Sequence, residues 1–306
     1  MIPTHDCAPY LRETLASVLA QDPGAELMQI EVVDDASSDR PEAVVEELGA
    51  GRVGFFRQPR NVGHVANFNT CLQRSRGRVV HLLHGDDCVR DGFYAAMARL
   101  LEAEPTAGAA FCRYIAIDDQ GDWSSIAALE QRAAGLIPDW LEKIAVGQRL
   151  QTPCMVVRRE VYEQVGGFDH RGGFAEDWEM WVRIAARYPV AYEPQPLALY
   201  RVHTLSRTGR MVRTGENVRD LRRVIEINRE HFAPAEADEI ASRALRETAI
   251  TCLRRARRLL GAGDTEAMGA QVREAVRSDA SARVLAEAAV VVAARCVLAT
   301  RRGRAP

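Results

Sequence analysis

Apolar residues recur at two different spacings along the first part of the chain. In residues 8–21 they recur every three or four positions and place Leu11, Leu15 and Val18 on one face, a pattern that predicts a helix. The same spacing predicts further helices over residues 41–48 and 64–75. Short, mostly apolar runs predict strands over residues 30–33, 79–83 and 109–112.

The alternation of these strands and helices predicts an α/β fold. Strands this rich in apolar residues are typical of a mainly parallel sheet that helices cover on both faces. In such a sheet the ligand site lies beyond the carboxyl ends of the strands. We therefore expect the site-forming residues of this chain to follow its predicted strands.

Acidic residues gather at two of these strand ends. Asp34 and Asp35 follow the first predicted strand, and Asp86 and Asp87 follow the second. Each pair has an ordinary interpretation, because aspartate begins turns and caps helices. Two clustered pairs favour a bound cation with a phosphate, since crowded like charges are destabilising unless they are neutralised. No G-x-G-x-x-G follows an early strand, and the chain contains no G-x-x-x-x-G-K-[ST], so we expect phosphate binding through a metal.

The chain beyond residue 215 has a helical pattern. Its helices are predicted between short Gly, Pro or Asp breaks, over residues 217–231, 234–260, 265–278 and 280–300. We expect two domains, residues 1–215 and residues 216–306. The segment LRRARRLL, at residues 253–260, is basic and amphipathic, which favours peripheral contact with a membrane surface. Formation of a homodimer through these helices is an alternative.

Composition narrows the class of protein. Of 306 residues, 47% are hydrophobic and 27% are charged, which is ordinary for a globular protein. The net charge of -2 argues against a nucleic-acid partner. The seven cysteines are scattered and never spaced C-x-x-C, which favours reduced thiols over disulfides or structural zinc. Without a signal-peptide pattern or a run of about 18 apolar residues, we expect a cytoplasmic protein with, at most, peripheral membrane association.

Several blocks of the chain resemble, in family order, those of family 2 glycosyltransferases of the GT-A fold. The blocks are IPTHDCAPYLRETLASVLAQ, VVDDASSD, NVGHVANFN, HLLHGDD, MVVRREVYEQVGGFD with FAEDWEMWVRIA, and LYRVHTLS, and they cover roughly residues 1–205. The resemblance implies a GT-A, Rossmann-like, mainly parallel sheet flanked by helices, followed here by a C-terminal helical region. The chain departs from the family in two places: few apolar residues precede IPT, and His84 replaces the first aspartate of the D-x-D motif.

The resemblance implies inverting transfer of a sugar from a nucleotide diphosphate sugar, UDP- or dTDP-linked, to an acceptor hydroxyl. The acceptor would be a saccharide or a lipid-linked molecule in bacterial polysaccharide, glycolipid or glycoconjugate synthesis. A divalent cation, Mn²⁺ or Mg²⁺, would neutralise the leaving pyrophosphate. The implied metal ligands are Asp86, Asp87 and His203. The segment SRTGRMVRTGE after His203 predicts a polar loop that closes over the pyrophosphate or forms a solvated basic face.

The resemblance also assigns nucleotide-binding and catalytic residues. The nucleotide-binding residues lie at the predicted strand ends and in NVGHVANFN: Pro3, Thr4, His5, Asp34, Asp35, Asn61, Gly63, Asn67, His84, Gly85 and Asp86. His5 is expected to stack on the base, and Asp35 to accept a hydrogen bond from a uracil or thymine N–H. Asp177 is the expected general base, with Glu176 orienting the acceptor. Taken by themselves, these two carboxylates are also typical of a helix cap with a favourable dipole.

Two other functions stay open at this point. A nucleotidyltransferase would share a nucleotide site and a carboxylate-held metal, but we would expect a basic glycine-rich segment near its first strand. The sole lysine of this chain is Lys143. A catalytically silent protein that binds sugar nucleotides is suggested by His84 and by the short first strand. Metal-dependent hydrolysis of a nucleotide sugar would separate an active transferase from the silent protein.

Overall fold

A computed structural model describes residues 1–203 and 207–302, with side chains described except at 207 and 296–302. The chain divides into two compact units. Unit 1 consists of Met1–Leu141, Gln148–His170 and Met180–Val202, and unit 2 of Glu142–Gly147, Arg171–Glu179 and His203–Pro306. The two units interleave along the chain, and the predicted domain boundary after residue 215 stays a prediction.

Unit 1 contains a three-stranded parallel sheet in the order β1-β2-β3. Its strands are β1 (Ile2–Thr4), β2 (Glu31–Asp34) and β3 (Gly54–Arg57). Thr4 pairs with Asp34, and Asp34 with Arg57, so the three strands end at the same level. Val32 and Val33 of the central strand are fully buried, which explains why the run predicted at 30–33 is apolar on both faces.

The second sheet of unit 1 is mixed and has the order β4-β9-β6-β10-β5, with β7 paired to β6 and β8 to β10. Its strands are β4 (Val79–His81), β5 (Cys88–Val89), β6 (Ala109–Ile117), β7 (Trp123–Ile126), β8 (Gly135–Leu136), β9 (Met155–Arg158) and β10 (Val190–Arg201). β6 and β10 are parallel, whereas β9 and β5 run antiparallel to their neighbours. The predicted α/β fold is confirmed. This sheet is mixed rather than mainly parallel, because the apolar pattern does not reveal β5 and β9.

Backbone hydrogen bonds join β1 to the segment that begins in β4. The Met1 nitrogen donates to the His81 carbonyl at 2.9 Å, and the Leu83 N–H donates to the Met1 carbonyl at 3.1 Å. One step further along, the Gly85 N–H donates to the Pro3 carbonyl at 3.0 Å. The residues that follow β4 therefore run alongside β1, and the two predicted acidic strand ends come to one edge of unit 1.

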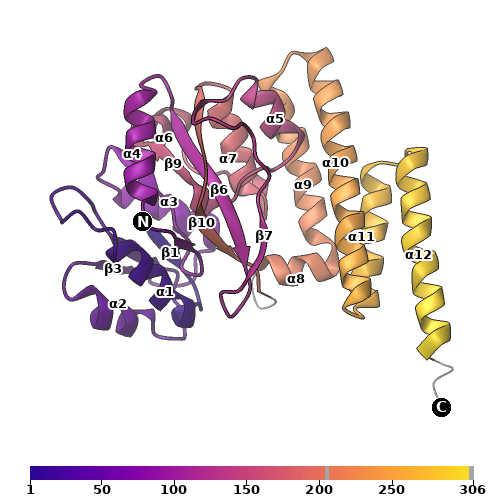
Figure 1. The fold of residues 1–306 in the computed structure, drawn as a ribbon, viewed down its shortest axis with the longest axis horizontal. Coiled ribbons are helices and arrows are strands. Elements are labelled where there is room, and N and C mark those ends of the chain that lie inside the picture. The colour runs from indigo at the N-terminus through magenta and orange to yellow at the C-terminus, as the bar shows by residue number, and fades with distance from the viewer. Residues whose placement is uncertain (204–206, 303–306) are drawn as a thin grey trace. The chain divides into compact units, whose positions relative to one another are not determined.

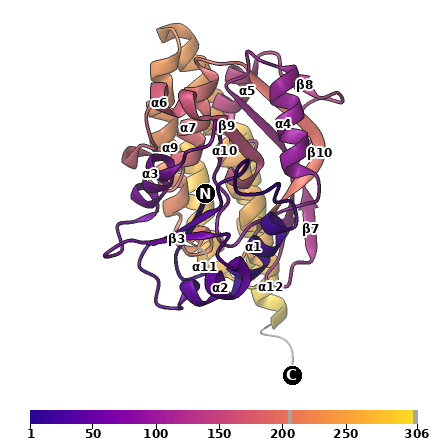
Figure 2. The same cartoon turned by 90° about the vertical axis from the view of Figure 1, so that its left-hand side faces the viewer.

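Helices cover the sheets of unit 1. They are α1 (Ala8–Leu19), α2 (Pro41–Gly49), α3 (His64–Arg74), α4 (Phe93–Ala103) and α6 (Arg159–Val165), while α5 (Trp140–Val146) and α7 (Glu176–Ala185) each cross between the units. Figures 1 and 2 show α1 beside α2, and α4 along β6 and β10. Leu11 and Leu15, on one face of α1 as predicted, are fully buried. The Asp39 carboxylate stabilises the start of α1, because its Oδ2 accepts the Ala8 N–H at 2.7 Å.

Unit 2 is built mainly from helices. Those that follow residue 206 are α8 (Arg207–Thr214), α9 (Glu216–Asn228), α10 (Pro234–Gly261), α11 (Thr265–Ser278) and α12 (Ala282–Arg302). The helices predicted beyond residue 215 are confirmed, whereas the described part of the predicted polar loop forms α8; residues 204–206 lie outside the described residues. Contacts with α11 and its N-cap stabilise α8. Gln271 Nε2 donates to the Val212 carbonyl at 2.7 Å, and Arg213 pairs with Asp264 at 2.8 Å.

The apolar core of unit 2 lies among α9, α10, α11 and α12. Its buried members are Val218, Ala249, Cys252, Leu253, Ala256, Leu260, Met268, Val272, Ala275, Val284, Ala288 and Val291. The leucines of LRRARRLL thus face this core, where Leu253 is 0% and Leu260 9% exposed. A membrane surface would meet the arginines of this segment and not its apolar face.

Two features of the described residues concern membrane-spanning helices and the state of the thiols. Within residues 1–203 and 207–302, no helix has the length and apolar character needed to cross a membrane. The cysteines with described side chains, all except Cys296, are buried and free. Burial raises the pKa of Cys7 and of Cys71 to about 12, so both thiols stay protonated and unreactive at neutral pH.

The buried His81 makes stability depend on pH. Its Nε2 lies 3.0 Å from the Pro153 carbonyl, which identifies Nε2 as the protonated nitrogen of a neutral ring. Burial lowers the pKa of His81 from 6.5 to about 3. Since the unfolded chain gains this proton first, the stability that neutral His81 confers is fully present above pH 6.5 and falls as the pH drops toward 3.

We expect His81→Gln to remove this pH dependence. Glutamine keeps a donor for the Pro153 carbonyl but takes up no proton in this range. Denaturant titrations of the wild type should therefore give a slope up to about 1.4 kcal/mol per pH unit steeper than those of the variant as the medium is acidified from neutrality. Identical slopes for the two proteins would contradict the assignment.

Candidate functional site

The ends of β1 and β2 and the segment after β4 meet at one edge of unit 1. The Asp35 N–H donates to the Thr4 carbonyl at 2.9 Å, and the Gly85 N–H to the Pro3 carbonyl at 3.0 Å. The structure thus brings together the predicted nucleotide-binding residues of three segments. Because these contacts are made by the backbone, they set the position of the side chains that follow.

Three side chains after β4 form a group that could hold a metal ion. One ligand atom each of His84, Asp86 and Asp87 lies within 4.8 Å of the other two. We call this group the His-Asp-Asp cluster. Carboxylate oxygens with one imidazole nitrogen suit Mn²⁺, and carboxylates alone suit Mg²⁺.

Asp87 carries the strongest sign that the cluster fits a cation. It is 1% exposed, and its Oδ1 accepts the backbone N–H of Arg201 at 2.8 Å. Its Oδ2 accepts no hydrogen bond and faces His84 Nδ1 at 3.6 Å. Burial, and then the charge of Asp86, raise the pKa of Asp87 well above its usual range. A bound cation would neutralise this pair and give Oδ2 a partner.

Aromatic packing fixes the ring of His84. It stacks on Phe68 of α3, with ring centroids 5.0 Å apart and an interplanar angle of 20°. Phe68 contacts Phe168 in turn, at 5.5 Å between centroids. This stacking holds the imidazole in place, and its 28% exposure leaves it partly open to solvent.

Gly85 is required by the close approach of two backbone segments. A Cβ at this position would lie 2.8 Å from Thr4 Oγ1 and 2.9 Å from Cys7 Sγ. Thr4 and Cys7 are themselves buried and in contact with each other at 2.9 Å, so neither side chain has room to move. Any larger residue at 85 would displace the His-Asp-Asp cluster from the end of β1.

Arg201, at the end of β10, is a functional residue that the sequence reasoning missed. Its side chain is fully buried; Nε donates to the Asp86 carbonyl at 3.0 Å and Nη1 to the Asp118 carbonyl at 2.9 Å. Its Nη2 pairs with Glu13. Together with its backbone bond to Asp87, these contacts make Arg201 a positioning residue of the cluster. Arg201 belongs to the LYRVHTLS block, but within that block only His203 was predicted as a site residue.

The predicted base-binding residues form a second group at the same edge. Asp35 accepts the Val62 N–H at 2.7 Å and the Gly63 N–H at 3.0 Å, one on each carboxylate oxygen. Asn61 Nδ2 lies 3.0 Å from His5 Nε2. Asp35 therefore holds the turn that carries Asn61, and each of its oxygens keeps one further acceptor site.

Asp34 and Asn67 have buried side chains that are bonded within the framework. Asp34 is 0% exposed, accepts the Ser37 N–H at 3.2 Å and lies 3.4 Å from Arg57 Nη1. Asn67 Nδ2 donates to the Val33 carbonyl at 2.8 Å and thereby ties α3 to β2. Their direct contact with a nucleotide stays a prediction, and the structure gives both a framework role.

The remaining predicted residues, Asp177, Glu176 and His203, belong to unit 2. The two carboxylates open α7, where the Trp178 N–H donates to Asp177 Oδ1 at 2.7 Å. Glu176 is buried, whereas Asp177 and His203 are partly exposed. Trp178 anchors this turn within unit 2, because its Nε1 donates to the Ile144 carbonyl at 2.6 Å. Whether these three residues act together with the His-Asp-Asp cluster stays a prediction.

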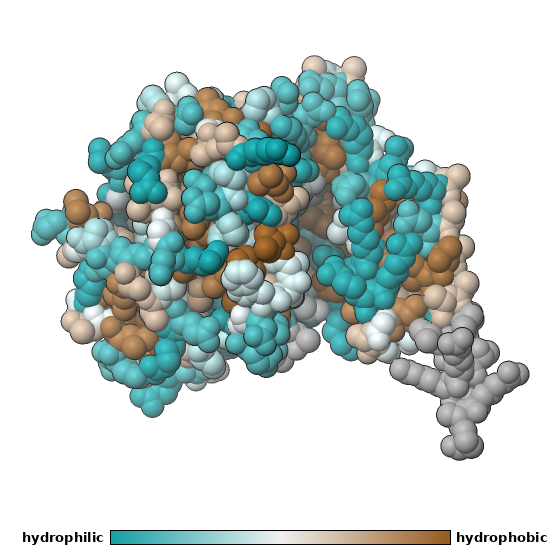
Figure 3. Space-filling view, viewed as in Figure 1, coloured by the Kyte–Doolittle hydropathy of each residue, from teal (hydrophilic) through white to brown (hydrophobic). Residues whose placement is uncertain are grey.

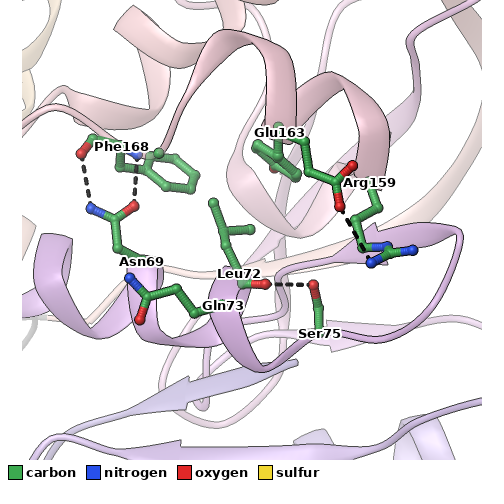
Figure 4. Close-up of a pocket in the computed structure, with 9 residues that line it drawn as sticks. Asn69, Leu72, Gln73, Ser75, Arg159, Glu163 and Phe168 are labelled. Carbon is green, nitrogen blue, oxygen red and sulfur yellow. Dashed lines mark hydrogen bonds and ion pairs between the residues drawn. The ribbon is translucent and has the colours of Figure 1, made fainter.

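A separate cavity of about 480 Å³ lies between the C-terminal half of α3 and α6 (Figure 4). None of the predicted site residues lines it. At its wall, Asn69 Nδ2 donates to the Phe168 carbonyl at 3.0 Å and Asn69 Oδ1 accepts the Phe168 N–H at 2.7 Å (Figure 4). The last asparagine of the NVGHVANFN block thus clamps the GGFD turn, and a Cβ on Gly167 would come within 2.3 Å of it.

Comparison with a family model identifies the class of this protein. The profile of the family described as "Glycosyl transferase family 2" matches residues 1–166, more than half of the chain. The chain therefore belongs to glycosyl transferase family 2.

Two proteins of Mycobacterium tuberculosis are similar to this chain in sequence. An uncharacterized Mycobacterium tuberculosis protein, MT1568, is 28% identical over 235 residues, which is 73% of each chain. Another protein of that species, Rv1520, is 26% identical, and the alignment spans about half of its length, 55%.

Solved structures confirm the predicted GT-A fold. The S. aureus protein TarS 1-349 in complex with UDP-GlcNAc has a TM-score of 0.64 at 14% identity and covers 92% of this chain and 91% of its own. The mannosyltransferase PcManGT from Pyrobaculum calidifontis, in complex with GDP-Man and Mn²⁺, has a TM-score of 0.59 at 19% identity and covers 98% of this chain and 79% of its own.

We expect Arg201→Lys to destabilise unit 1 and to loosen the His-Asp-Asp cluster. Lysine lacks the planar fork that reaches two carbonyls and a carboxylate at once, so buried acceptors lose their partners. The free energy of unfolding should fall by about 1–3 kcal/mol. The matched control is Arg12→Lys, which changes an exposed ion pair with Glu47 and should leave stability near the wild type. Equal unfolding curves for the two variants would contradict the positioning role.

Proposed function

We propose that this glycosyltransferase transfers a sugar, with inversion, from a UDP- or dTDP-linked donor to an acceptor hydroxyl in a cation-dependent reaction. The observation that carries the proposal is the His-Asp-Asp cluster, which lies at the same sheet edge as the turn held by Asp35. A diphosphate and a base would thus find their partners within one site of unit 1. The unbonded Oδ2 of Asp87 supports cation binding there.

Asp86 and Asp87 would hold the cation, with His84 as a further ligand. When bound, Mn²⁺ or Mg²⁺ supplies a Lewis acid that stabilises negative charge on the leaving pyrophosphate. Arg201 keeps the two aspartates in register with β1, as its bonds to the Asp86 carbonyl and the Asp87 carboxylate indicate. His203, which belongs to unit 2, is a further proposed ligand besides Asp86, Asp87 and His84.

Asp35 and His5 would recognise the base. The free acceptor sites of the Asp35 carboxylate favour a base that presents an N–H, as uracil and thymine do. The exposed ring of His5, held by Asn61, supplies a surface for stacking. The UDP-GlcNAc and GDP-Man complexes of proteins with this fold support a nucleotide diphosphate sugar as the donor class.

Asp177 would accept the proton of the acceptor hydroxyl, and Glu176 would orient the acceptor. Asp177 is partly exposed at the start of α7, which supports contact with an acceptor, and its Oδ1 accepts the Trp178 N–H. We propose a saccharide or a lipid-linked molecule as acceptor, in bacterial polysaccharide, glycolipid or glycoconjugate synthesis. A catalytically silent sugar-nucleotide-binding protein is the second candidate, because His84 replaces an aspartate of the family motif.

We expect Asp86→Asn to abolish metal-dependent nucleotide binding while the fold stays intact. Asparagine keeps the size of the side chain but removes the charge that a hard cation requires. Calorimetric titration of UDP should show affinity that depends on Mn²⁺ for the wild type and no such dependence for the variant. Asp91→Asn, at an exposed aspartate before α4, is the control and should bind like the wild type. Unchanged UDP affinity in Asp86→Asn would overturn the metal assignment.

We expect Asp177→Asn to lower transfer by at least about 10²-fold while donor binding barely moves. The amide cannot take a proton at neutral pH, but asparagine caps a helix about as well as aspartate. A helix cap alone therefore predicts wild-type activity and melting temperature. Asp238→Asn, at an exposed aspartate of unit 2, is the control. Retained transfer by Asp177→Asn would refute its role as the base, and a wild type that binds donor but transfers nothing would favour the silent protein.

A further inference from the structure

One face of α12 is apolar and exposed. Toward the core of unit 2 the helix presents Val284, Ala288 and Val291, which are buried. The exposed positions between the charged residues Arg283 and Arg295 are all apolar: Leu285, Ala286, Ala289, Val290, Val292, Ala293 and Ala294. We call these seven residues the outer face of α12. Figure 3 draws much of the described part of this helix in tan and brown.

The apolar residues of the outer face are contiguous, unlike the single apolar residues that any protein exposes. Leu285, Val290 and Val292 are 45%, 61% and 46% exposed, and they follow one another within two turns of helix. Glu287, the one acid of this stretch, points away and pairs with Arg257 of α10 at 3.3 Å. A contiguous exposed apolar face of this kind is typical of a site that contacts a membrane or another protein.

Glu287 also pairs with Arg283 at 3.5 Å, and the charged residues between Glu287 and residue 306 are all arginines. Arg295 is exposed at the end of the described side chains, and the sequence continues with Arg301, Arg302 and Arg304. An apolar helical face followed by clustered arginines matches the interface of a bilayer, where acyl chains lie beneath anionic headgroups.

We propose that α12 attaches this protein to an anionic membrane surface. The helix lies along the surface, because it lacks the apolar length to cross it. The outer face enters the region between headgroups and acyl chains, and the exposed Arg295 contacts lipid phosphates. This attachment replaces the contact predicted for residues 253–260, whose leucines pack in the core of unit 2, and it does not depend on the proposed function.

A vesicle flotation assay with the full chain tests the attachment. The wild type should float with vesicles of phosphatidylcholine mixed with phosphatidylglycerol, much less with pure phosphatidylcholine, and less as salt is raised. Val290→Glu places a charge in the outer face and should lower the partition coefficient at least about tenfold. Leu27→Glu introduces the same change at a residue of unit 1 that is 79% exposed, and it should bind like the wild type.

A second variant tests the basic part without altering the apolar face. Replacing the exposed Arg295 with glutamine should weaken binding to the anionic vesicles about fivefold, with no change in melting temperature. Failure of the wild type to float, or equal flotation of Val290→Glu and Leu27→Glu, would overturn the proposal. A solution mass of two chains that Val290→Glu reduces to one would also overturn it, in favour of a second copy of the chain on this face.

Discussion

A short stretch of backbone pairing sets the geometry of the site. β1 has only three residues and forms few hydrogen bonds. Those that it makes to the segment that begins at His81 join the parallel sheet to the mixed sheet. The two segments approach so closely that Gly85 has no room for a Cβ. The His-Asp-Asp cluster therefore lies at the end of β1 because of this pairing. The backbone pairing brings the metal-ligating residues together, and their side chains determine what the site can bind.

Asp87, the buried member of the cluster, has one carboxylate oxygen that accepts no hydrogen bond. Arg201 donates mainly to carbonyl groups and so fixes the loop after β4, and the Asp87 carboxylate accepts only its backbone N–H. Asp87 keeps a raised pKa, which means that a proton competes with a cation for this residue. Cation binding should thus strengthen as the pH rises through that pKa. An arrangement that leaves charge uncompensated is expected where a ligand completes it, since a purely structural site would gain stability from full pairing.

The sequence predicted the parts of this molecule that depend on local pattern. The helices and the acidic strand ends at Asp34 and Asp86 follow from apolar spacing and from the position of ligand sites in α/β sheets. The order of the mixed sheet could not be predicted, because β5 is two residues long and pairs with a strand more than a hundred residues away. The role of Arg201 was missed for the same reason. Its partners Asp86 and Glu13 are distant in sequence, and only tertiary structure brings a buried guanidinium to their backbone and side chains.

Sequence pattern alone also does not reveal which faces of the amphipathic helices α10 and α12 are buried in unit 2. LRRARRLL in α10 has the clearer pattern, with leucines on one face and arginines on the other, and its leucines fill the core. α12 has a weaker pattern, because apolar residues surround it on nearly all sides, and one face suffices to pack on unit 2. A helix that is apolar all round is ordinarily buried all round. α12 is an exception to this rule. Its outer face therefore requires a second apolar environment. Because arginines follow this face in the sequence, an anionic interface fits both its shape and its charge.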